Sequence, residues 1–210
     1  TFNQVLKSPD NEYKYEYAKE LYASGKYSQA ISLLQDVVTI LKGTEKAEES
    51  LFMLSMAQFH YKDYETAAEY FKRYCKSYPK GIYAEQACYY IGESLYYSTP
   101  EPRLDQTETV NAIAAFQEFL DIYTDSKGKE RAQERLIQLQ DKLVRKELLS
   151  AQLYFNLGSY FGNCLTGGSN YEACIITSQN ALKDYPYSRE REAFSLLIMK
   201  SKYHLAKQSV

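Results

Sequence analysis

The sequence contains no tryptophan, only five prolines and only nine glycines among its 210 residues. With so few turn-forming residues, long helices are favoured over a sheet of many short strands. No apolar run approaches the roughly 18–20 residues that span a bilayer. The formal net charge is −2, whereas nucleic-acid-binding proteins normally carry a clear basic excess. The composition therefore indicates a helical globular protein that does not bind nucleic acid.

Residues suited to catalysis are also scarce. The two histidines, His60 and His204, lie far apart in the sequence. The zinc-protease pattern H-E-x-x-H, the nucleophile elbow G-x-S-x-G and the phosphate-binding glycine loops are all absent. Most carboxylates fall at positions typical of solvated helix faces. We therefore expect no catalytic residue, no metal site and no cofactor.

The four cysteines, Cys75, Cys88, Cys164 and Cys174, form no C-x-x-C pair and match no zinc-site spacing. Because cysteine is a common core residue, free thiols are the expected state. One pairing stays open, since Cys75 and Cys88 flank a Tyr-Pro turn and could lie on adjacent antiparallel helices.

Tyrosine is abundant, with 22 residues, and the aromatic residues follow a repeat of 37 positions. Shifting the sequence by 37 aligns units at 11–47, 48–84 and 85 onward. In the second unit, a helix over about 47–61, a short turn and a helix over about 64–77 are predicted, closed by a Pro and a Gly. The shift produces two aromatic columns and one column of small residues: Tyr15, Phe52 and Tyr89; Tyr22, Phe59 and Tyr96; Ala18, Ser55 and Gly92.

This plan resembles the tetratricopeptide repeat (TPR), most clearly in ASGKYSQAISLL at 23–34 and YKDYETAAEYFKRYCKSYP at 61–79. We therefore predict an all-α TPR solenoid, a right-handed superhelix of helix pairs that forms one domain over 1–210. In unit three, a first helix over about 83–97 is followed by an interruption at 98–109 before the second helix. The segment 129–157 has no Gly or Pro and predicts one long helix. A loop at 161–169, a further helix and a final helix over about 189–207 follow.

The two aromatic columns allow two interpretations. If the first helix of each pair lines a groove, they form a ladder that receives an extended peptide, with Lys19 as a charge partner for a client carboxylate. Tyrosine suits that task because it has an apolar body, a polar tip and few rotors. Alternatively, the rings fill the seams between stacked units. The candidate peptide-binding residues are Tyr15, Lys19, Tyr22, Phe52, Phe59, Tyr89 and Tyr96.

Four segments together resemble the BamD family, also called YfiO or ComL, of outer-membrane β-barrel assembly lipoproteins. They are YFKRYCKSYPKGIYAEQACYYIGESLYYS at 70–98, STPEPRLDQTETVNAIAAFQEFLDIY at 98–123, RLIQLQDKLVRKELLSAQLYFNLGSY at 135–160 and ALKDYPYSREREAFSLLIMKSKYHLAKQSV at 181–210. The interruption and the ending look like the Bacteroidetes branch. The resemblance covers nearly the whole chain.

The resemblance implies a periplasmic protein held on the outer membrane by a lipidated N-terminal cysteine. It also implies binding to the POTRA region of the central barrel-forming subunit and to the C-terminal segments of unfolded outer-membrane proteins. The sequence starts at Thr1 without that cysteine, so a trimmed form is expected. The loop at 161–169 departs from the family pattern where partner contacts would be placed.

We therefore expect a non-enzymatic scaffold and substrate receptor for outer-membrane protein insertion. Its N-terminal half, repeats one to three at 11–126, would hold the client. Its C-terminal half, 127–210, would dock the barrel subunit. The alternative is another periplasmic TPR adaptor of the cell envelope.

Overall fold

A computed structural model describes residues 2–160 and 169–208, and within them all regular structure is α-helical. The helices form two compact units. Unit one comprises residues 1–99 and 107–136, and unit two comprises residues 100–106 and 137–210. The helices are α1 (Phe2–Leu6), α2 (Asn11–Ala23), α3 (Tyr27–Ile40), α4 (Lys46–His60), α5 (Tyr64–Ser77), α6 (Ala84–Ser98), α7 (Thr107–Ile122), α8 (Lys129–Leu157), α9 (Asn170–Asp184) and α10 (Arg191–Gln208).

The helix boundaries follow the sequence pattern closely. Helices α5 and α8 begin and end at the predicted residues, and α4 and α6 are displaced by one. The short α1 was not predicted, and its Val5 is buried against the rest of unit one. The predicted loop at 161–169, including Cys164, lies outside the described residues except for Ser169. The all-α prediction is confirmed over the part of the chain that the structure describes.

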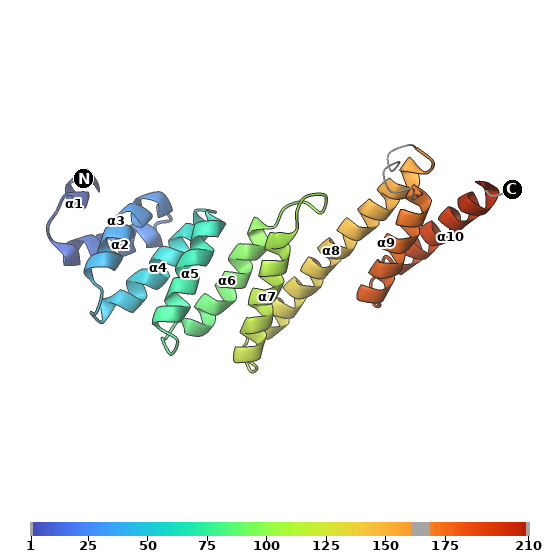
Figure 1. The fold of residues 1–210 in the computed structure, drawn as a ribbon. Helices are drawn as coiled ribbons and strands as arrows, with labels where there is room; N and C mark the ends of the chain where they lie inside the picture. The colour runs from blue at the N-terminus through green and yellow to red at the C-terminus, as the bar shows by residue number, and fades with distance from the viewer. Residues whose placement is uncertain (1, 161–168, 209–210) are drawn as a thin grey trace. The chain divides into compact units, whose positions relative to one another are not determined.

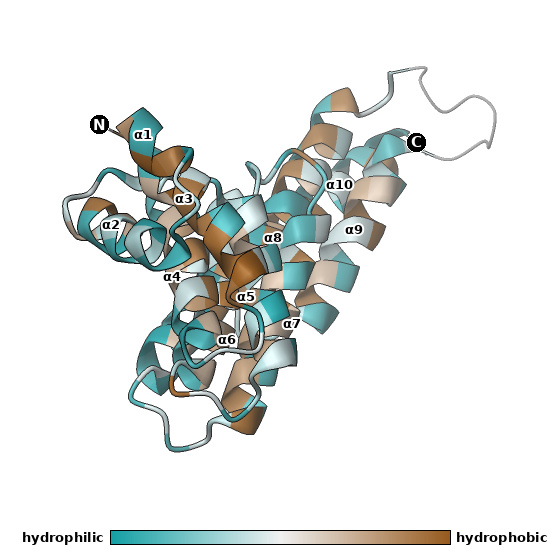
Figure 2. Cartoon of the chain, turned by 90° about the vertical axis from the view of Figure 1, so that its left-hand side faces the viewer, coloured by the Kyte–Doolittle hydropathy of each residue, from teal (hydrophilic) through white to brown (hydrophobic). Residues whose placement is uncertain are grey.

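In unit one, successive helices from α2 to α7 lie side by side, each packed on the one before it (Figure 1). The helices carry both apolar and polar segments (Figure 2), and the apolar side chains meet in one core that extends from α1 to α6. Leu33, Leu34, Leu54 and Phe71 are among its fully buried members. Because each helix pair buries its apolar face only against its neighbours, the unit is a stack of repeats.

The turns inside the first two repeats have the same geometry, 37 residues apart. Gly25 follows α2 with φ = 74° and Lys62 follows α4 with φ = 67°, both in the left-handed region. In each case the amide that follows this residue donates back to a carbonyl of the last turn, as in a Schellman motif (Lys26 to Leu21, Asp63 to Gln58). The repeat therefore imposes this backbone conformation even where the residue is not glycine.

The residues of the small-residue column let the next helix approach closely. Ala18 and Ser55 are fully buried, and Gly92 is buried in α6. A Cβ added at Gly92 would lie 2.7 Å from the ring of Phe116 on α7. The ring itself has no exposed surface, so α7 packs directly on the α6 backbone.

Unit two has its own core, built where the second part of α8 meets α9 and α10. It is formed by side chains from all three helices: Val144, Leu148 and Ala151 of α8, Cys174 and Ala181 of α9, and Phe194 and Leu197 of α10. A capping box begins α9. The Ser169 side chain accepts a hydrogen bond from a backbone amide of the first turn, and the Glu172 side chain accepts one from the Ser169 amide.

Replacing Gly92 with Ala tests the close packing of α6 on α7. The change should lower the free energy of unfolding by about 1–2 kcal/mol, because the overpacking cost exceeds the gain in helix propensity. Urea denaturation checks this. Adding Phe116→Leu to Gly92→Ala should recover part of the loss, and an equally stable Gly92→Ala protein would contradict the packing described here.

Candidate functional site

The first aromatic column lies inside the seams between helices. Tyr15 on α2 is only 1% exposed and Tyr89 on α6 is also buried. Phe52 on α4 is half-buried and stacks on Tyr83 just before α6, with the ring centroids 4.4 Å apart. Tyr15 and Tyr89 therefore fill the seams between helices, and Phe52 is partly covered in the same way. We call these three side chains the seam residues.

Each buried seam tyrosine directs its hydroxyl at a carboxylate. Tyr15 donates to Glu49 of α4, which also forms an ion pair with Lys19 at 3.2 Å. Tyr89 donates to Glu93 one turn later on α6, at 2.8 Å. Burial, followed by the bond to the carboxylate, raises the pKa of both hydroxyls. The bond from Tyr15, together with Lys19, holds the pKa of Glu49 below its usual range.

Lys19 was expected as a charge partner for a client carboxylate. In the structure its ammonium group forms an ion pair with Glu49 and lies over the Tyr15 ring, 5.2 Å from the ring centroid. Its side chain is part-exposed. A client carboxylate at Lys19 would therefore compete with Glu49 for the same charge.

The second aromatic column lies at the ends of the first helices of the repeats, beside the turns. There it joins neighbouring rings into a chain of contacts across α2 to α6, with centroid separations from 4.9 to 6.2 Å. We call this chain the aromatic strip. Its members are Tyr22, Tyr27, Phe59, His60, Tyr64, Tyr96 and Tyr97.

The aromatic strip has the partial exposure that a binding surface needs. Tyr97 is 48% exposed and His60 is also exposed, whereas Tyr22, Phe59 and Tyr96 are half-buried. His60 stacks on Tyr27 with the ring centroids 4.9 Å apart. Partial burial lowers the pKa of the His60 imidazole. The strip thus combines apolar ring faces with hydroxyl and imidazole edges.

Four members of the strip were missed by the candidate set drawn from the sequence. His60 and Tyr97 are 37 residues apart and each directly follows a residue of the second column. The same spacing relates Tyr27 and Tyr64 at the start of the second helices. The 37-residue repeat was therefore enough to find all seven rings in the sequence. The residue type alone does not distinguish a ring of the strip from a ring of the seam.

At its far end, the strip meets an ion pair between α6 and the first part of α8. Glu93 is 6% exposed and accepts hydrogen bonds from Arg135 on both carboxylate oxygens, at 3.0 and 3.2 Å. The guanidinium of Arg135 also lies over the Tyr96 ring, 4.1 Å from its centroid. One arginine therefore neutralises a buried carboxylate and covers one face of the last ring of the column.

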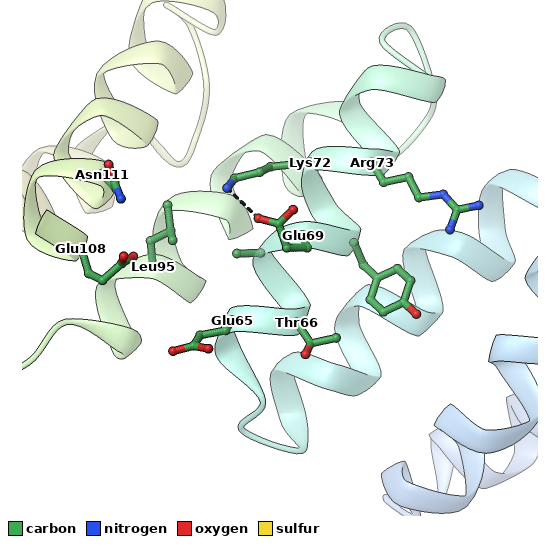
Figure 3. Close-up of a pocket in the computed structure, with 10 residues that line it drawn as sticks. Glu65, Thr66, Glu69, Lys72, Arg73, Leu95, Glu108 and Asn111 are labelled. Carbon is green, nitrogen blue, oxygen red and sulfur yellow. Dashed lines mark hydrogen bonds and ion pairs between the residues drawn. The ribbon is translucent and has the colours of Figure 1, made fainter.

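A cavity of about 850 Å³ lies elsewhere on unit one, along α5, and residues of α6 and α7 line one side of it (Figure 3). Carboxylates line it from two helices, Glu65 and Glu69 on α5 and Glu108 on α7, and Lys72 pairs with Glu69 at 2.9 Å. Its walls carry both signs of charge and little aromatic surface. The cavity therefore lacks the ring faces that distinguish the aromatic strip.

Comparison with known proteins identifies the family. The model of the YfiO family, described as outer membrane lipoprotein, matches residues 8–209. The chain belongs to the YfiO family. It is thus a BamD-type TPR protein of an outer membrane lipoprotein family, as the four segments at 70–98, 98–123, 135–160 and 181–210 predicted. Among the described residues, none of the helices is long and apolar enough to span a membrane.

No curated protein matches the chain. Two crystal structures of a putative kinesin light chain from Podosopora anserina, with nearly identical TPR-like repeats, are similar to it. One of them, a point variant, has 13% identity and a TM-score of 0.48, over 93% of this chain and 94% of that one. The other has 12% identity and a TM-score of 0.48, over 96% and 99%.

Replacing Arg135 with Ala tests the ion pair at the end of the strip. Loss of the guanidinium leaves the buried Glu93 carboxylate without its cation, which should reduce the free energy of unfolding by about 2–4 kcal/mol. The matched control is Arg131→Ala, one turn earlier on the same helix and exposed, which should change stability by less than about 0.5 kcal/mol. Equal losses in the two variants on urea denaturation would contradict a specific role for Arg135.

Proposed function

We propose that this protein is a non-enzymatic scaffold and substrate receptor of the machinery that folds and inserts β-barrel proteins into the outer membrane. The observation that carries the proposal is membership of the YfiO family over residues 8–209. In this proposal the protein works at the periplasmic face of the membrane, held there by a lipid anchor. Its partners are the POTRA region of the central barrel-forming subunit and unfolded outer-membrane proteins.

The client side of the proposal rests on the aromatic strip of unit one. Membrane β-strands alternate apolar and polar side chains, with aromatic residues at the membrane interfaces. An extended segment of this kind presents rings and aliphatic side chains on one side and backbone amides along its edges. The faces of Tyr22, Phe59 and Tyr97 can take the apolar side chains, while tyrosine hydroxyls and His60 can bond the peptide backbone. The seam residues would support the strip without touching the client.

The docking side of the proposal rests on unit two, which contains most of the C-terminal half at 127–210. Several large apolar side chains are exposed there on α8, α9 and α10 and in the segments between them. Exposed apolar side chains that gather on one part of a protein mark interaction surfaces. A cavity of about 460 Å³ on α8 is lined by Leu149 and Leu153 together with Arg103 and Lys146. The exposed apolar residues of unit two include Ile137, Leu153, Tyr160, Ile176, Tyr187, Met199 and Tyr203.

Client binding is tested with a fluorescent peptide of about ten residues, the length of one membrane strand, copied from the C-terminus of a β-barrel protein of the source organism. The triple variant Tyr22→Ala, Phe59→Ala, Tyr96→Ala should bind the peptide about tenfold more weakly or worse in fluorescence anisotropy, because it removes three ring faces. Tyr97→Ala, which changes one exposed ring, should weaken binding in the same direction with little effect on folding.

Tyr13→Ala is the control, because Tyr13 is similarly exposed on α2 but lies outside the strip. It should bind the peptide like the unmodified protein. Circular dichroism establishes that each variant is folded. If the folded triple variant and Tyr97→Ala both keep full affinity, the strip is not the client site.

The partner is tested by isolating the tagged protein from solubilised envelopes of the source organism and identifying its companions by mass spectrometry. The POTRA-bearing subunit should be recovered in near-equal amount. Leu153→Glu, which places a charge on the exposed apolar surface of unit two, should lose that subunit. Ile40→Glu, a matched change at an exposed residue of unit one, should retain it. Recovery of a different envelope complex would overturn the assembly role and favour another periplasmic TPR adaptor.

A further inference from the structure

Two cysteines face each other across the seam between the second and third repeats. Cys75 lies near the end of α5 and Cys88 in the first part of α6, and both side chains are half-buried. Their sulfur atoms are 2.7 Å apart and are not bonded to each other in this structure. Non-bonded heavy atoms pack best at about 3.5–4.0 Å, so the fold holds these thiols closer than ordinary packing requires.

Each of the two thiols has one further hydrogen-bond contact among the described residues. The Cys75 thiol donates to the Ala84 carbonyl oxygen at 3.9 Å, and the Tyr123 hydroxyl donates to the Cys88 sulfur at 3.9 Å. The contact between the two thiols, in which either sulfur can donate, lowers the pKa of Cys88 and raises that of Cys75. Cys88 is the better candidate for attack on an oxidant, because the Tyr123 hydroxyl donates to its sulfur and so stabilises the thiolate.

We propose that Cys75 and Cys88 form an intramolecular disulfide that clamps α5 to α6, and so joins the second repeat to the third. The compartment is the one given by the proposed function, since disulfides form and persist in the bacterial periplasm. The pairing itself rests on the geometry of the two thiols alone. Cys174 provides the contrast, because it is completely buried in the core of unit two.

The oxidant in this step is a disulfide, either that of a thiol oxidoreductase or oxidised glutathione. The Cys88 thiolate attacks one sulfur of the oxidant, forms a mixed disulfide and releases one thiolate. The Cys75 thiolate then attacks the Cys88 sulfur, forms the intramolecular bond and releases the second thiolate. Together the two cysteine thiols lose two protons and two electrons. The oxidant disulfide takes up these protons and electrons and becomes two thiols.

The clamp would act on the helix pair that carries the α6 end of the aromatic strip. Tyr64 on α5 stacks on Tyr97 of α6 with the ring centroids 5.0 Å apart. Phe71 on α5 likewise stacks on Tyr90 of α6 at 5.5 Å. A covalent bond between these helices fixes the seam on which both stacks depend, and it restricts the unfolded chain as well.

The pairing is tested on the purified full-length chain after incubation with oxidised glutathione, alkylation of the remaining thiols and tryptic digestion without reductant. Cleavage after Lys and Arg places Cys75 in peptide 74–76 and Cys88 in peptide 81–103. The expected product is these two peptides joined by one disulfide, lost on reduction. Two separately alkylated peptides, or bonds to Cys164 or to a second molecule, would overturn the proposal. This test does not depend on the cellular location of the protein. A failure of the disulfide proposal can therefore be distinguished from a failure of the proposed function.

Thermal unfolding tests the clamp. The oxidised chain should melt about 5–10 °C above the reduced chain, because the bond reduces the conformational entropy of the unfolded chain. The double variant Cys75→Ser, Cys88→Ser should show no difference between oxidising and reducing conditions. The Cys174→Ser control should keep the difference, whatever its own stability. A wild-type chain that melts at the same temperature in both states would contradict a clamp even where the bond forms.

Discussion

A pair of helices cannot bury its apolar face by itself, and the rest of this structure follows from that constraint. Each repeat of unit one is completed by the next, so the contacts that matter most are those across the seams. Close approach at a seam needs a small residue on one side and a large ring on the other. Gly92 against Phe116 is such a case, because the α6 backbone itself forms the wall on which the ring packs.

Three tyrosines, Tyr15, Tyr74 and Tyr89, are buried in the described part of the chain. A buried phenylalanine would fill the space, but a buried tyrosine must also place its hydroxyl against a partner. Here the partners are carboxylates on the same or a neighbouring helix: Glu49 for Tyr15, Glu48 for Tyr74 and Glu93 for Tyr89. Each carboxylate then needs donors of its own, which Lys19 and Arg135 supply to two of them. The seams are thereby specified by directional bonds as well as by volume.

The repeat register predicted much of the fold and part of the candidate site. The glycine- and proline-free run predicted α8 from end to end, and the turn and closing proline predicted α5, because these signals are local. The division of the rings between seam and strip was not predictable in the same way. Tyr15 and Tyr22 are both tyrosines and lie on the same helix. The first is buried because α4 packs against it, and the sequence does not show that packing. Likewise, sequence spacing allowed Cys75 and Cys88 to be neighbours, but their sulfur separation depends on how α5 and α6 pack.

The two aromatic columns arise from the same repeat and have two different roles. Rings at the start of the first helices stabilise the stack, and rings at the ends of the same helices, seven residues later, remain partly open beside the turns. Since 37 residues separate equivalent positions, every added repeat extends the buried column and the strip together. A surface produced in this way has a fixed spacing and a rigid support. Those are the properties that an extended segment with alternating side chains would need in a receptor, because the receptor then loses little conformational entropy on binding.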